Sequence, residues 1–425
     1  MVAWAGSARA QDTEMAAIRA PELDGEQITI LGPWLGAEAE ALNNVLDPFR
    51  EMTGAEVIYE GTSTFEQDII LRTDGSRPPN LSAFPQPGLA AELAREGKLA
   101  PLSEATSDWI LNNYAAGESW LELGSFAGPD GDEALYGFFY NVSVKSLVWY
   151  SPTAFAAAGY SVPETFEDLL LLSARIAENG TSPWCIGLGS GEASGWPATD
   201  WVEDLLLRTQ PPEVYDAWTG GEIPFDDPRV LAALELFGRF ASDAWTNGGA
   251  EASASIDYRD AATGLFTEPP QCYLHKQASF ITPFFPEDVA LGRNASFFYF
   301  PSFASQDLGE PVLGAGTLWA MTNDSEGARA LLEYLKTPLA HELWMARGGF
   351  LTPHLGVDTA LYADSVLRGQ GDILRDATTF RFDGSDLMPG AVGAGAFWEG
   401  MLDLVRGATP EEVAGAIQEV WEGLR

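Results

Sequence analysis

Basic residues are scarce in this chain: 23 lysines and arginines stand against 62 aspartates and glutamates, so the formal net charge is −39 at pH 7. A negative field of this size repels nucleic acid and anionic membrane surfaces, and no basic stripe offsets it. We therefore predict that the protein binds no nucleic acid. The acidic excess is interpreted as a solvated surface, with adaptation to salt as a further interpretation.

Long hydrophobic runs are also missing, and none reaches the roughly 18 residues that a membrane-spanning helix requires. Near the start, Ala8-Arg9-Ala10 followed by Gln11 resembles the tail and cleavage site of a secretory signal, although the apolar core of a signal is absent. We predict that residues 1–26 are a signal-peptide remnant and leader, and that the protein is exported to the periplasm. A disordered leader is the alternative.

Cysteine is the next rarity, with two residues in the whole chain, Cys185 and Cys272. In an exported protein both thiols meet an oxidising compartment, where two cysteines pair more often than they stay free. We predict one disulfide between them. Closing a loop of that length would stabilise the fold by about 4 to 5 kcal/mol in the chain-entropy model.

Catalytic motifs are absent as well. The three histidines lie far apart, and His341-Glu342 lacks the second histidine of a zinc-peptidase helix. The chain has neither a phosphate-binding Gly-x-x-x-x-Gly-Lys motif nor a Gly-x-Ser-x-Gly elbow. Residues 187–191 lack the third glycine of a dinucleotide loop, and the acidic residues 130–133 fall short of a calcium loop. We predict a protein that is no enzyme, with no catalytic residue, metal or cofactor.

What the sequence does contain is a regular alternation of strand and helix over a length of 425 residues, which is too long for one ordinary core. Hydrophobic periodicity predicts strands at 28–31, 56–60 and 81–84, separated by helices at 38–52 and 65–72 and followed by a helix at 88–96. Such alternation is typical of a parallel, doubly wound α/β sheet. We predict two α/β domains.

Two long extended segments interrupt this alternation. Residues 136–150 and 295–301 are β-rich, and a strand of such length could run from one domain into the other. We therefore predict that each domain is discontinuous, with a hinge where the chain crosses. The predicted boundaries are 27–137 plus 298–347 for the N-terminal lobe, and 138–297 plus 348–425 for the C-terminal lobe.

Aromatic residues beside glycine and proline recur in the predicted loops, as in the stretches at 84–87, 195–197, 283–286 and 397–398. Most of them should be core residues, but together they suit a cleft that stacks the flat C–H face of a sugar while polar side chains bind its hydroxyls. The last stretch is preceded by a run of small residues, 389–396, which would let the backbone lie close to the hinge and the cleft.

The order of several short motifs resembles the extracellular solute-binding proteins of family 1, the carbohydrate-binding group. The similarity extends from Gln27 to the C-terminus, and its anchors are DPFREMTG at 47–54, VWY at 148–150, PFDDP at 224–228, QASFI at 277–281 and the segment 388–398. The stretches PWC at 183–185, GWPATDW at 195–201 and RGGF at 347–350 resemble the α-glucoside-binding branch.

This resemblance implies a two-lobed periplasmic-binding-protein fold, each lobe a doubly wound sheet flanked by helices. It also implies that Trp398 stacks on a sugar, as the corresponding tryptophan does in maltose-binding relatives. The loop at Gln86 lacks the charged pair of those relatives, which favours a small glucoside over a maltodextrin. The candidate ligand-binding residues are Trp34, Glu38, Ser63, Gln86, Trp196, Asp200, Phe285, Gly316, Arg347, Asp386 and Trp398.

The implied function is a monomeric substrate-binding protein that closes around a small sugar and delivers it to an ABC importer. Two alternatives stay open. One is a binding protein for another disaccharide or glycosylated polyol, such as sucrose, trehalose or glucosylglycerol. The other is a secreted glycoside hydrolase that uses two carboxylates.

Overall fold

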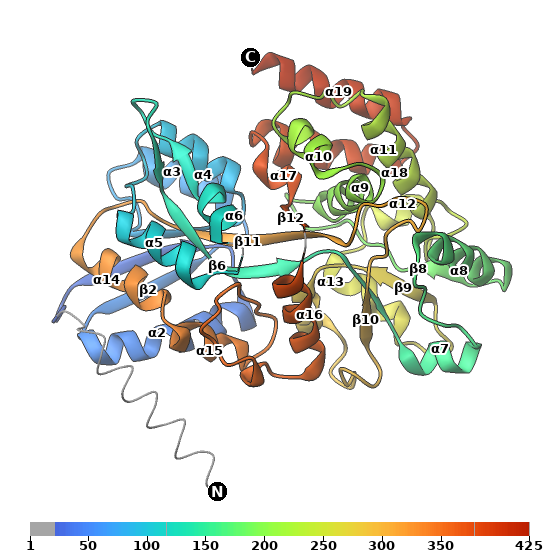
Figure 1. The fold of residues 1–425 in the computed structure, drawn as a ribbon, viewed down its shortest axis with the longest axis horizontal. Coiled ribbons are helices and arrows are strands. Elements are labelled where there is room, and N and C mark those ends of the chain that lie inside the picture. Colours follow the sequence, from blue (N-terminus) through green and yellow to red (C-terminus); the bar gives the residue numbers. More distant parts are fainter. Residues whose placement is uncertain (1–21, 116, 378, 425) are drawn as a thin grey trace, which may run out of the picture. The chain divides into compact units, whose positions relative to one another are not determined.

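The computed structural model describes residues 22–115, 117–377 and 379–424. Of the predicted leader, residues 1–21 lie outside the described part of the chain. The chain forms two compact units, one containing the residues up to Asn141 together with Gly316–Ala363, the other containing Val142–Ala315 and the residues from Asp364 onwards. Both units combine sheets with covering helices, so the predicted α/β class is confirmed (Figure 1).

The chain passes between the units within two strands, β6 (Gly137–Val144) and β11 (Pro311–Met321), and again after Ala363. Residues 298–315 therefore fall in the second unit and 348–363 in the first, which differs from the boundaries predicted above. The reason is visible in β11, which changes its partner along its length. Its first half pairs with β12 (Thr379–Phe382), and its second half pairs with β3 (Leu81–Phe84).

The first unit is built on parallel strands, beside which the second half of β11 runs antiparallel. Its further elements are β1 (Gln27–Gly32), α2 (Gly36–Thr53), β2 (Glu56–Gly61), α3 (Phe65–Asp74), α4 (Pro87–Arg95), α5 (Glu104–Asn113), α6 (Gly117–Leu123), β4 (Ser125–Ala127), β5 (Glu133–Leu135), α14 (Glu326–Leu335), α15 (Pro338–Met345) and the 3-10 turn η3 (Thr359–Leu361). Strand β1 lies between β2 and β3 and is parallel to both. Right-handed crossovers then place α2 and α3 on opposite faces, as Figure 1 shows.

The second unit has a sheet in the order β10-β7-β9-β8. Its elements are β7 (Leu147–Tyr150), α7 (Pro152–Ala158), α8 (Phe166–Glu178), β8 (Ser182–Trp184), α9 (Trp196–Thr209), α10 (Pro212–Thr219), α11 (Pro228–Phe240), α12 (Ala250–Ser253), α13 (Tyr258–Ala261), η1 (Ala262–Leu265), β9 (Cys272–Lys276), η2 (Ser279–Phe284), β10 (Ser296–Tyr299), α16 (Ser365–Asp376), α17 (Gly384–Leu387), the π-helix η4 (Ala391–Phe397), α18 (Trp398–Val405) and α19 (Pro410–Gly423). This sheet is mixed rather than parallel, because β7 runs opposite to both of its neighbours.

The extended segment predicted over 136–150 is two strands. Strand β6 ends at Val144 and β7 begins at Leu147, so Lys145 and Ser146 form a break. Lys145 donates its backbone N–H to the carbonyl of Leu313 (2.8 Å), and the hydroxyl of Ser146 accepts the N–H of Leu313 (2.8 Å). The break is thus held by β11 and turns the Lys145 side chain into the second unit.

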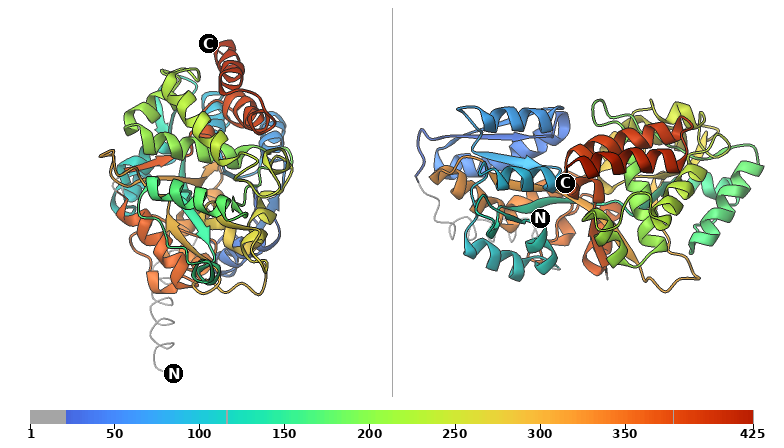
Figure 2. Two further views of the ribbon diagram at one scale, coloured as in Figure 1. Left: turned by 90° about the vertical axis from the view of Figure 1, so that its right-hand side faces the viewer. Right: turned by 90° about the horizontal axis from the view of Figure 1, so that it is seen from above.

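An aromatic core fills the second unit, where Trp184, Trp201 and Phe240 pack ring against ring. Helices α18 and α19 lie side by side in both views of Figure 2, and both pack on the α9–α11 pair. This packing fixes the start of α18, and therefore Trp398, relative to the start of α9.

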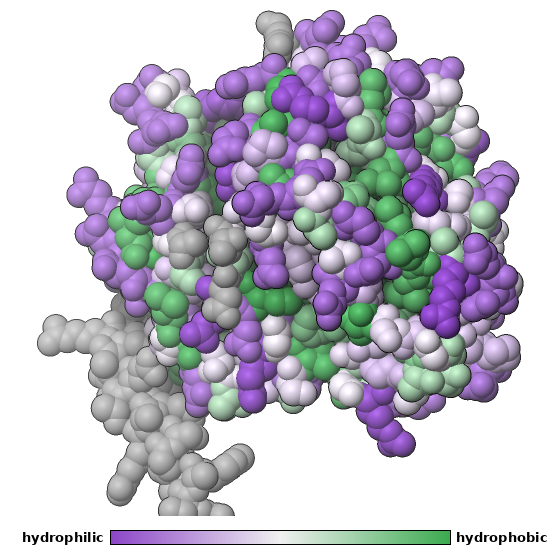
Figure 3. All heavy atoms as spheres, turned by 45° about the vertical axis from the view of Figure 1, so that its right-hand side comes forward, coloured by the Kyte–Doolittle hydropathy of each residue, from purple (hydrophilic) through white to green (hydrophobic). Residues whose placement is uncertain are grey.

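The surface agrees with the acidic composition. Hydrophilic side chains dominate the face drawn in Figure 3. Within the described part of the chain, no helix combines the length and the apolar character that crossing a membrane requires.

Candidate ligand-binding residues in each unit

In the first unit, four predicted residues follow the carboxyl ends of parallel strands. Trp34 and Glu38 come after β1, Ser63 after β2, and Gln86 after β3. Since these strands are parallel, their following loops meet at one edge of the sheet. The strand order reverses between β1 and β3, and ligands of open α/β sheets bind at such a switch point. The structure therefore brings the loops of Trp34, Glu38 and Gln86 to the position where a ligand is expected.

Gln86 is the most informative residue of this edge. Its side chain is 8 % exposed, and its Oε1 atom has no hydrogen-bond partner within the described residues. A buried carbonyl oxygen without a partner costs about 1 to 3 kcal/mol, so native proteins rarely leave one unpaired. A ligand hydroxyl that donates to this oxygen would remove the cost. Ser63 lies on the neighbouring loop and is exposed.

Trp34 is held rigidly rather than left free. Its ring meets the rings of Trp344 (5.1 Å between centroids) and Trp319 (6.0 Å). Its backbone N–H donates to the hydroxyl of Tyr59 (2.8 Å), and that hydroxyl donates to the Trp34 carbonyl (3.0 Å). Burial, assisted by the charge of Glu38, raises the pKa of Tyr59, so the phenol stays neutral. Trp34 is thus firmly packed beneath the loops that follow the parallel strands.

The two remaining predicted residues of the first unit lie elsewhere along the chain. Gly316 is half-buried within β11, at the point where this strand enters the unit. Arg347 is exposed just after the end of α15.

In the second unit, the structure brings together the start of α9 and the start of α18. The hydroxyl of Ser385, in α17, is shared by the indole Nε1 of Trp398 (3.4 Å) and the hydroxyl of Thr199 (3.2 Å). Gly195 precedes α9 with a φ of 111°, and a Cβ there would lie 2.1 Å from the Trp398 carbonyl oxygen. Only glycine permits this approach. The start of α9, which carries Trp196 and Asp200, thus lies against the backbone of Trp398.

Trp398 and its neighbour Phe397 have different environments. The ring of Phe397 is fully buried in the hydrophobic core, against Phe225 (5.1 Å) and Trp218 (5.7 Å). Trp398 is 6 % exposed and lies outside that core cluster of the described residues, beside the polar side chain of Ser385. A core role therefore belongs to Phe397, which leaves Trp398 as the candidate for stacking.

Trp196 belongs to a half-buried group of aromatic rings. It contacts Tyr258 (4.9 Å between centroids) and Phe280 (6.0 Å). The predicted residue Phe285 is buried elsewhere, where its ring packs on Trp149 (5.3 Å) and Phe266 (5.1 Å). The ring beside Trp196 is thus Phe280, which lies in the QASFI motif and was not among the predicted residues, whereas the role of Phe285 stays a prediction.

A buried group of charges lies under these residues, and the sequence did not reveal it. The ammonium Nζ of Lys145 contacts Asp200 (2.7 Å to Oδ1) and Asp383. Burial alone would lower the pKa of Lys145, but the charges of Asp200, Asp383 and neighbouring carboxylates raise it well above its ordinary value. Burial raises the pKa of Asp200 to about 7, although Lys145 opposes this rise. The same burial raises the pKa of Glu203 well above its usual range.

Three carboxylates of this group, those of Asp200, Glu203 and Asp383, have oxygen atoms within 4.8 Å of one another, a spacing that could hold a metal ion. However, the Lys145 ammonium contacts two of the three directly, and Glu203 accepts the backbone N–H groups of Gly384 (2.8 Å) and Ser385 (3.0 Å). These donors are the partners that the carboxylates require. We interpret the group as a buried ion-pair network.

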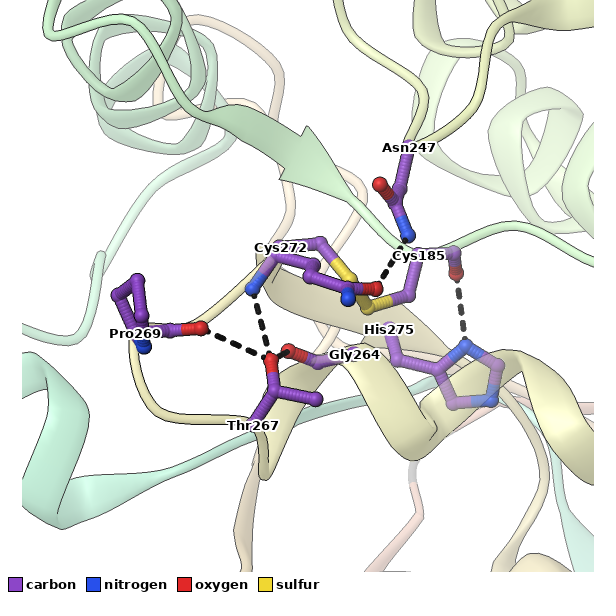
Figure 4. Close-up of a disulfide and its surroundings, with 8 residues drawn as sticks. Cys185, Asn247, Gly264, Thr267, Pro269, Cys272 and His275 are labelled. Carbon is purple, nitrogen blue, oxygen red and sulfur yellow. Dashed lines mark hydrogen bonds between the residues drawn. A yellow bond between two sulfur atoms is a disulfide. The ribbon is translucent and has the colours of Figure 1, made fainter.

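The predicted disulfide between Cys185 and Cys272 is present and joins the residue after β8 to the first residue of β9, with the two Cα atoms 5.5 Å apart (Figure 4). The imidazole Nδ1 of His275 lies 2.8 Å from the carbonyl oxygen of Cys185, so β9 is tied to the same segment by a second bond. The cross-link therefore stiffens the sheet of the second unit.

Comparison with known proteins gives consistent matches. The model of the family "Bacterial extracellular solute-binding protein" matches residues 33–340. The alpha-glucosides-binding periplasmic protein AglE of Rhizobium meliloti is 54 % identical over 406 residues, covering 95 % of this chain and 89 % of the relative. The osmoprotective compounds-binding protein GgtB of Synechocystis sp. is 45 % identical over 399 residues, covering 94 % and 93 %.

Solved structures agree on the fold. The bacterial solute receptor AcbH, described with a preference for β-D-galactopyranose, has a TM-score of 0.80 at 18 % identity and covers 94 % of this chain and 99 % of its own. Maltose-bound MalE3 of T. maritima has a TM-score of 0.68 at 14 % identity, covering 94 % and 100 %.

Proposed function

We propose that this chain, which belongs to the bacterial extracellular solute-binding proteins, captures a small α-glucoside outside the cytoplasm and delivers it to an ABC importer. The match to the family model and the 54 % identity to AglE confirm the family that was predicted from the sequence. The observation that carries the proposal is the 54 % identity to AglE across 95 % of the chain. Membership of this family places the protein outside the cytoplasm. That it lies in the periplasm and is a monomer is part of the proposal.

The residues of each unit support a sugar as ligand. A pyranose ring has an apolar C–H face, which packs well on Trp398 and on the half-buried Trp196. Its hydroxyls need acceptors, and Gln86 offers a buried oxygen that has no partner among the residues that the structure describes. The same mixture of aromatic and polar groups is typical of small-molecule sites. Of the predicted residues, Trp398, Trp196 and Gln86 are the ones whose surroundings support the proposal.

A second candidate is a glycosylated polyol, because GgtB, named for osmoprotective compounds, is 45 % identical over nearly the whole chain. Such compounds also carry a glucose ring, so the aromatic group could serve either ligand. The difference lies in the second half of the ligand, which the sequence does not specify.

Calorimetric titration and thermal melting against maltose, sucrose, trehalose, glucosylglycerol, galactose and glucose test both candidates. A true ligand at 100 times its Kd should stabilise the protein by about 2.7 kcal/mol. We expect at least one α-glucoside to bind and galactose to be excluded. Failure of every glucoside and of glucosylglycerol to bind would refute the proposal.

The relatives are named as binding proteins, and we propose that this chain is likewise no enzyme. Incubation with p-nitrophenyl α- and β-glucosides checks this point. Steady release of p-nitrophenol would instead support the hydrolase alternative. The predicted closure of the units on ligand stays a prediction, and small-angle scattering tests it: the radius of gyration should fall when a bound sugar saturates the protein.

A further inference from the structure

The break between β6 and β7 places one lysine at an unusual junction. Lys145 follows the last residue of β6, and its backbone N–H is bonded to Leu313 of β11. The chain passes from the first unit to the second within β6 and returns to the first within β11. Asp383, at the end of β12, is tied to the same strand, because its N–H donates to the carbonyl of Gly314 (2.8 Å).

The side chain of Lys145 links this junction to α9, which carries Trp196, and to the segment before α17. Its ammonium contacts Asp200, one helical turn after Trp196 in α9, and also Asp383, just before α17. The ammonium also lies 5.3 Å from the centroid of the Trp196 ring. A single buried cation therefore joins α9, the segment before α17 and the crossing strands.

From Asp383 the contacts continue to Trp398. The Oδ1 atom of Asp383 accepts the hydroxyl of Ser385 (2.8 Å) and the N–H of Asp386 (3.1 Å). The oxygen of Ser385 is in turn the partner of the Trp398 indole (3.4 Å). Each link is a hydrogen bond between buried groups, where geometry is enforced because an unpaired charge or dipole is costly.

We propose that Lys145 is a positioning residue for ligand recognition: its ammonium holds Asp200 and Asp383 so that Trp196 and Trp398 keep a fixed placement relative to β6 and β11. The inference deepens the proposed function and rests on it for the ligand. Lys145 itself touches no ligand in this scheme. It acts through the carboxylates, as residues that support a recognition site commonly do.

A neighbouring ion-pair group provides a matched control. Arg208 and Lys276 both pair with Asp204, at 2.8 Å and 3.1 Å, and all three side chains are buried. The Arg208 guanidinium is further bonded to the carbonyl of Phe300 and contacts neither Asp383 nor Ser385 by any bond of the described residues. Removing Arg208 should therefore destabilise the same unit without releasing Trp398.

The experiment uses full-length protein labelled with 5-fluorotryptophan, in which Trp196→Phe and Trp398→Phe assign two ¹⁹F resonances. Lys145→Met keeps the aliphatic stem and removes the charge. We expect both resonances to shift or broaden in folded Lys145→Met without any sugar, to return toward wild type in Lys145→Arg, and to stay unchanged in Arg208→Met. If Lys145→Met fails to fold, Asp383→Asn tests the same contact between Lys145 and Asp383.

Titration with trehalose and sucrose then measures the consequence for recognition. Affinity should fall by up to about 100-fold in Lys145→Met, the loss typical of misplaced groups, and little in Arg208→Met. Unchanged ¹⁹F resonances in a folded variant, or shifted resonances with wild-type affinity, would overturn the proposal. If the wild type binds neither sugar nor any other in the panel, the proposed function fails, whereas the ¹⁹F comparison still decides whether Lys145 positions the tryptophans.

Discussion

Replacing Trp398 by alanine separates recognition from stability, because the adjacent Phe397 offers a control on the same backbone. The indole of Trp398 makes one long hydrogen bond, to Ser385 at 3.4 Å, and lies outside the core cluster. The indole is also only 6 % exposed, so its truncation should cost stability as well as any face that it offers to a sugar. Loss of a central aromatic from a recognition site costs about 2 to 4 kcal/mol. Affinity should fall by roughly 30- to 1000-fold.

Phe397→Ala should give the opposite result. Its ring is fully buried against Phe225 and Trp218, so truncation leaves a cavity and should lower the free energy of unfolding by about 3 to 5 kcal/mol. The folded fraction of this variant should keep an affinity close to wild type, because the ring faces the core.

The assay combines calorimetric titration at 25 °C with urea unfolding of both variants and of the wild type. Both variants should lose stability, since both rings are buried, but affinity should fall strongly in folded Trp398→Ala and stay close to wild type in folded Phe397→Ala. Near-normal affinity in a strongly destabilised Trp398→Ala would refute the assignment and make Trp398 a structural residue.

Three further predictions follow from single groups. Gln86→Leu should weaken sugar binding yet raise the free energy of unfolding of the free protein by about 1 kcal/mol, because an unpaired buried oxygen is removed; equal or lower stability in urea would contradict this. Double replacement of Cys185 and Cys272 by serine should cost about 4 to 5 kcal/mol of stability and leave sugar affinity nearly unchanged, and the unreduced, denatured wild type should titrate no free thiol. Burial lowers the pKa of His275 to about 4. The stability that comes from keeping this imidazole neutral is therefore present above pH 6.5 and is lost as the pH falls toward 4. Relative to His275→Asn, the free energy of unfolding of the wild type in urea titrations should fall by about 3 kcal/mol across that pH range.

The first unit could be predicted closely from the sequence because its signals are local. Leu42, Val45 and Phe49 fall on one face at helical spacing, and all three are buried in α2. The strands β1, β2 and β3 were likewise predicted from short apolar runs bounded by turns. Once their parallel pairing is expected, the loops at their carboxyl ends become candidates. The selection of Trp34, Glu38 and Gln86 within these loops came from the resemblance to the carbohydrate-binding family.

The charged network could not be predicted, because its partners are distant in sequence. Lys145 and Asp383 lie 238 positions apart, and Lys145 and Asp200 lie 55 apart. In a chain with 62 acidic residues, no local pattern marks the two carboxylates that a given lysine will bury. The one available signal was a lysine inside the β-rich segment 136–150, where an exposed strand position is the ordinary interpretation.

The omission of Phe280 from the predicted residues has a different cause. The segment 280–286 contains three phenylalanines and two prolines, so periodicity does not distinguish the ring near Trp196 from the ring that packs on Trp149. The 3-10 helix η2 determines the outcome, since it brings Phe280 near Trp196, whereas Phe285 comes after its last turn and packs on Trp149. Such short helices carry little sequence signal.

The run of small residues before Trp398 acts through close packing. The residues from Ala391 to Phe397 form a π-helix that leads directly into α18. A Cβ on Gly393 would lie 1.8 Å from the carbonyl oxygen of Ser385, so the absence of a side chain lets this helix press against α17. That approach brings Trp398 to the Ser385 hydroxyl, and through it to Asp383 and Lys145. Glycine in this segment therefore fixes the position of the indole by close packing and does not act by making the chain flexible; on the proposed role of Trp398, this placement would serve sugar binding.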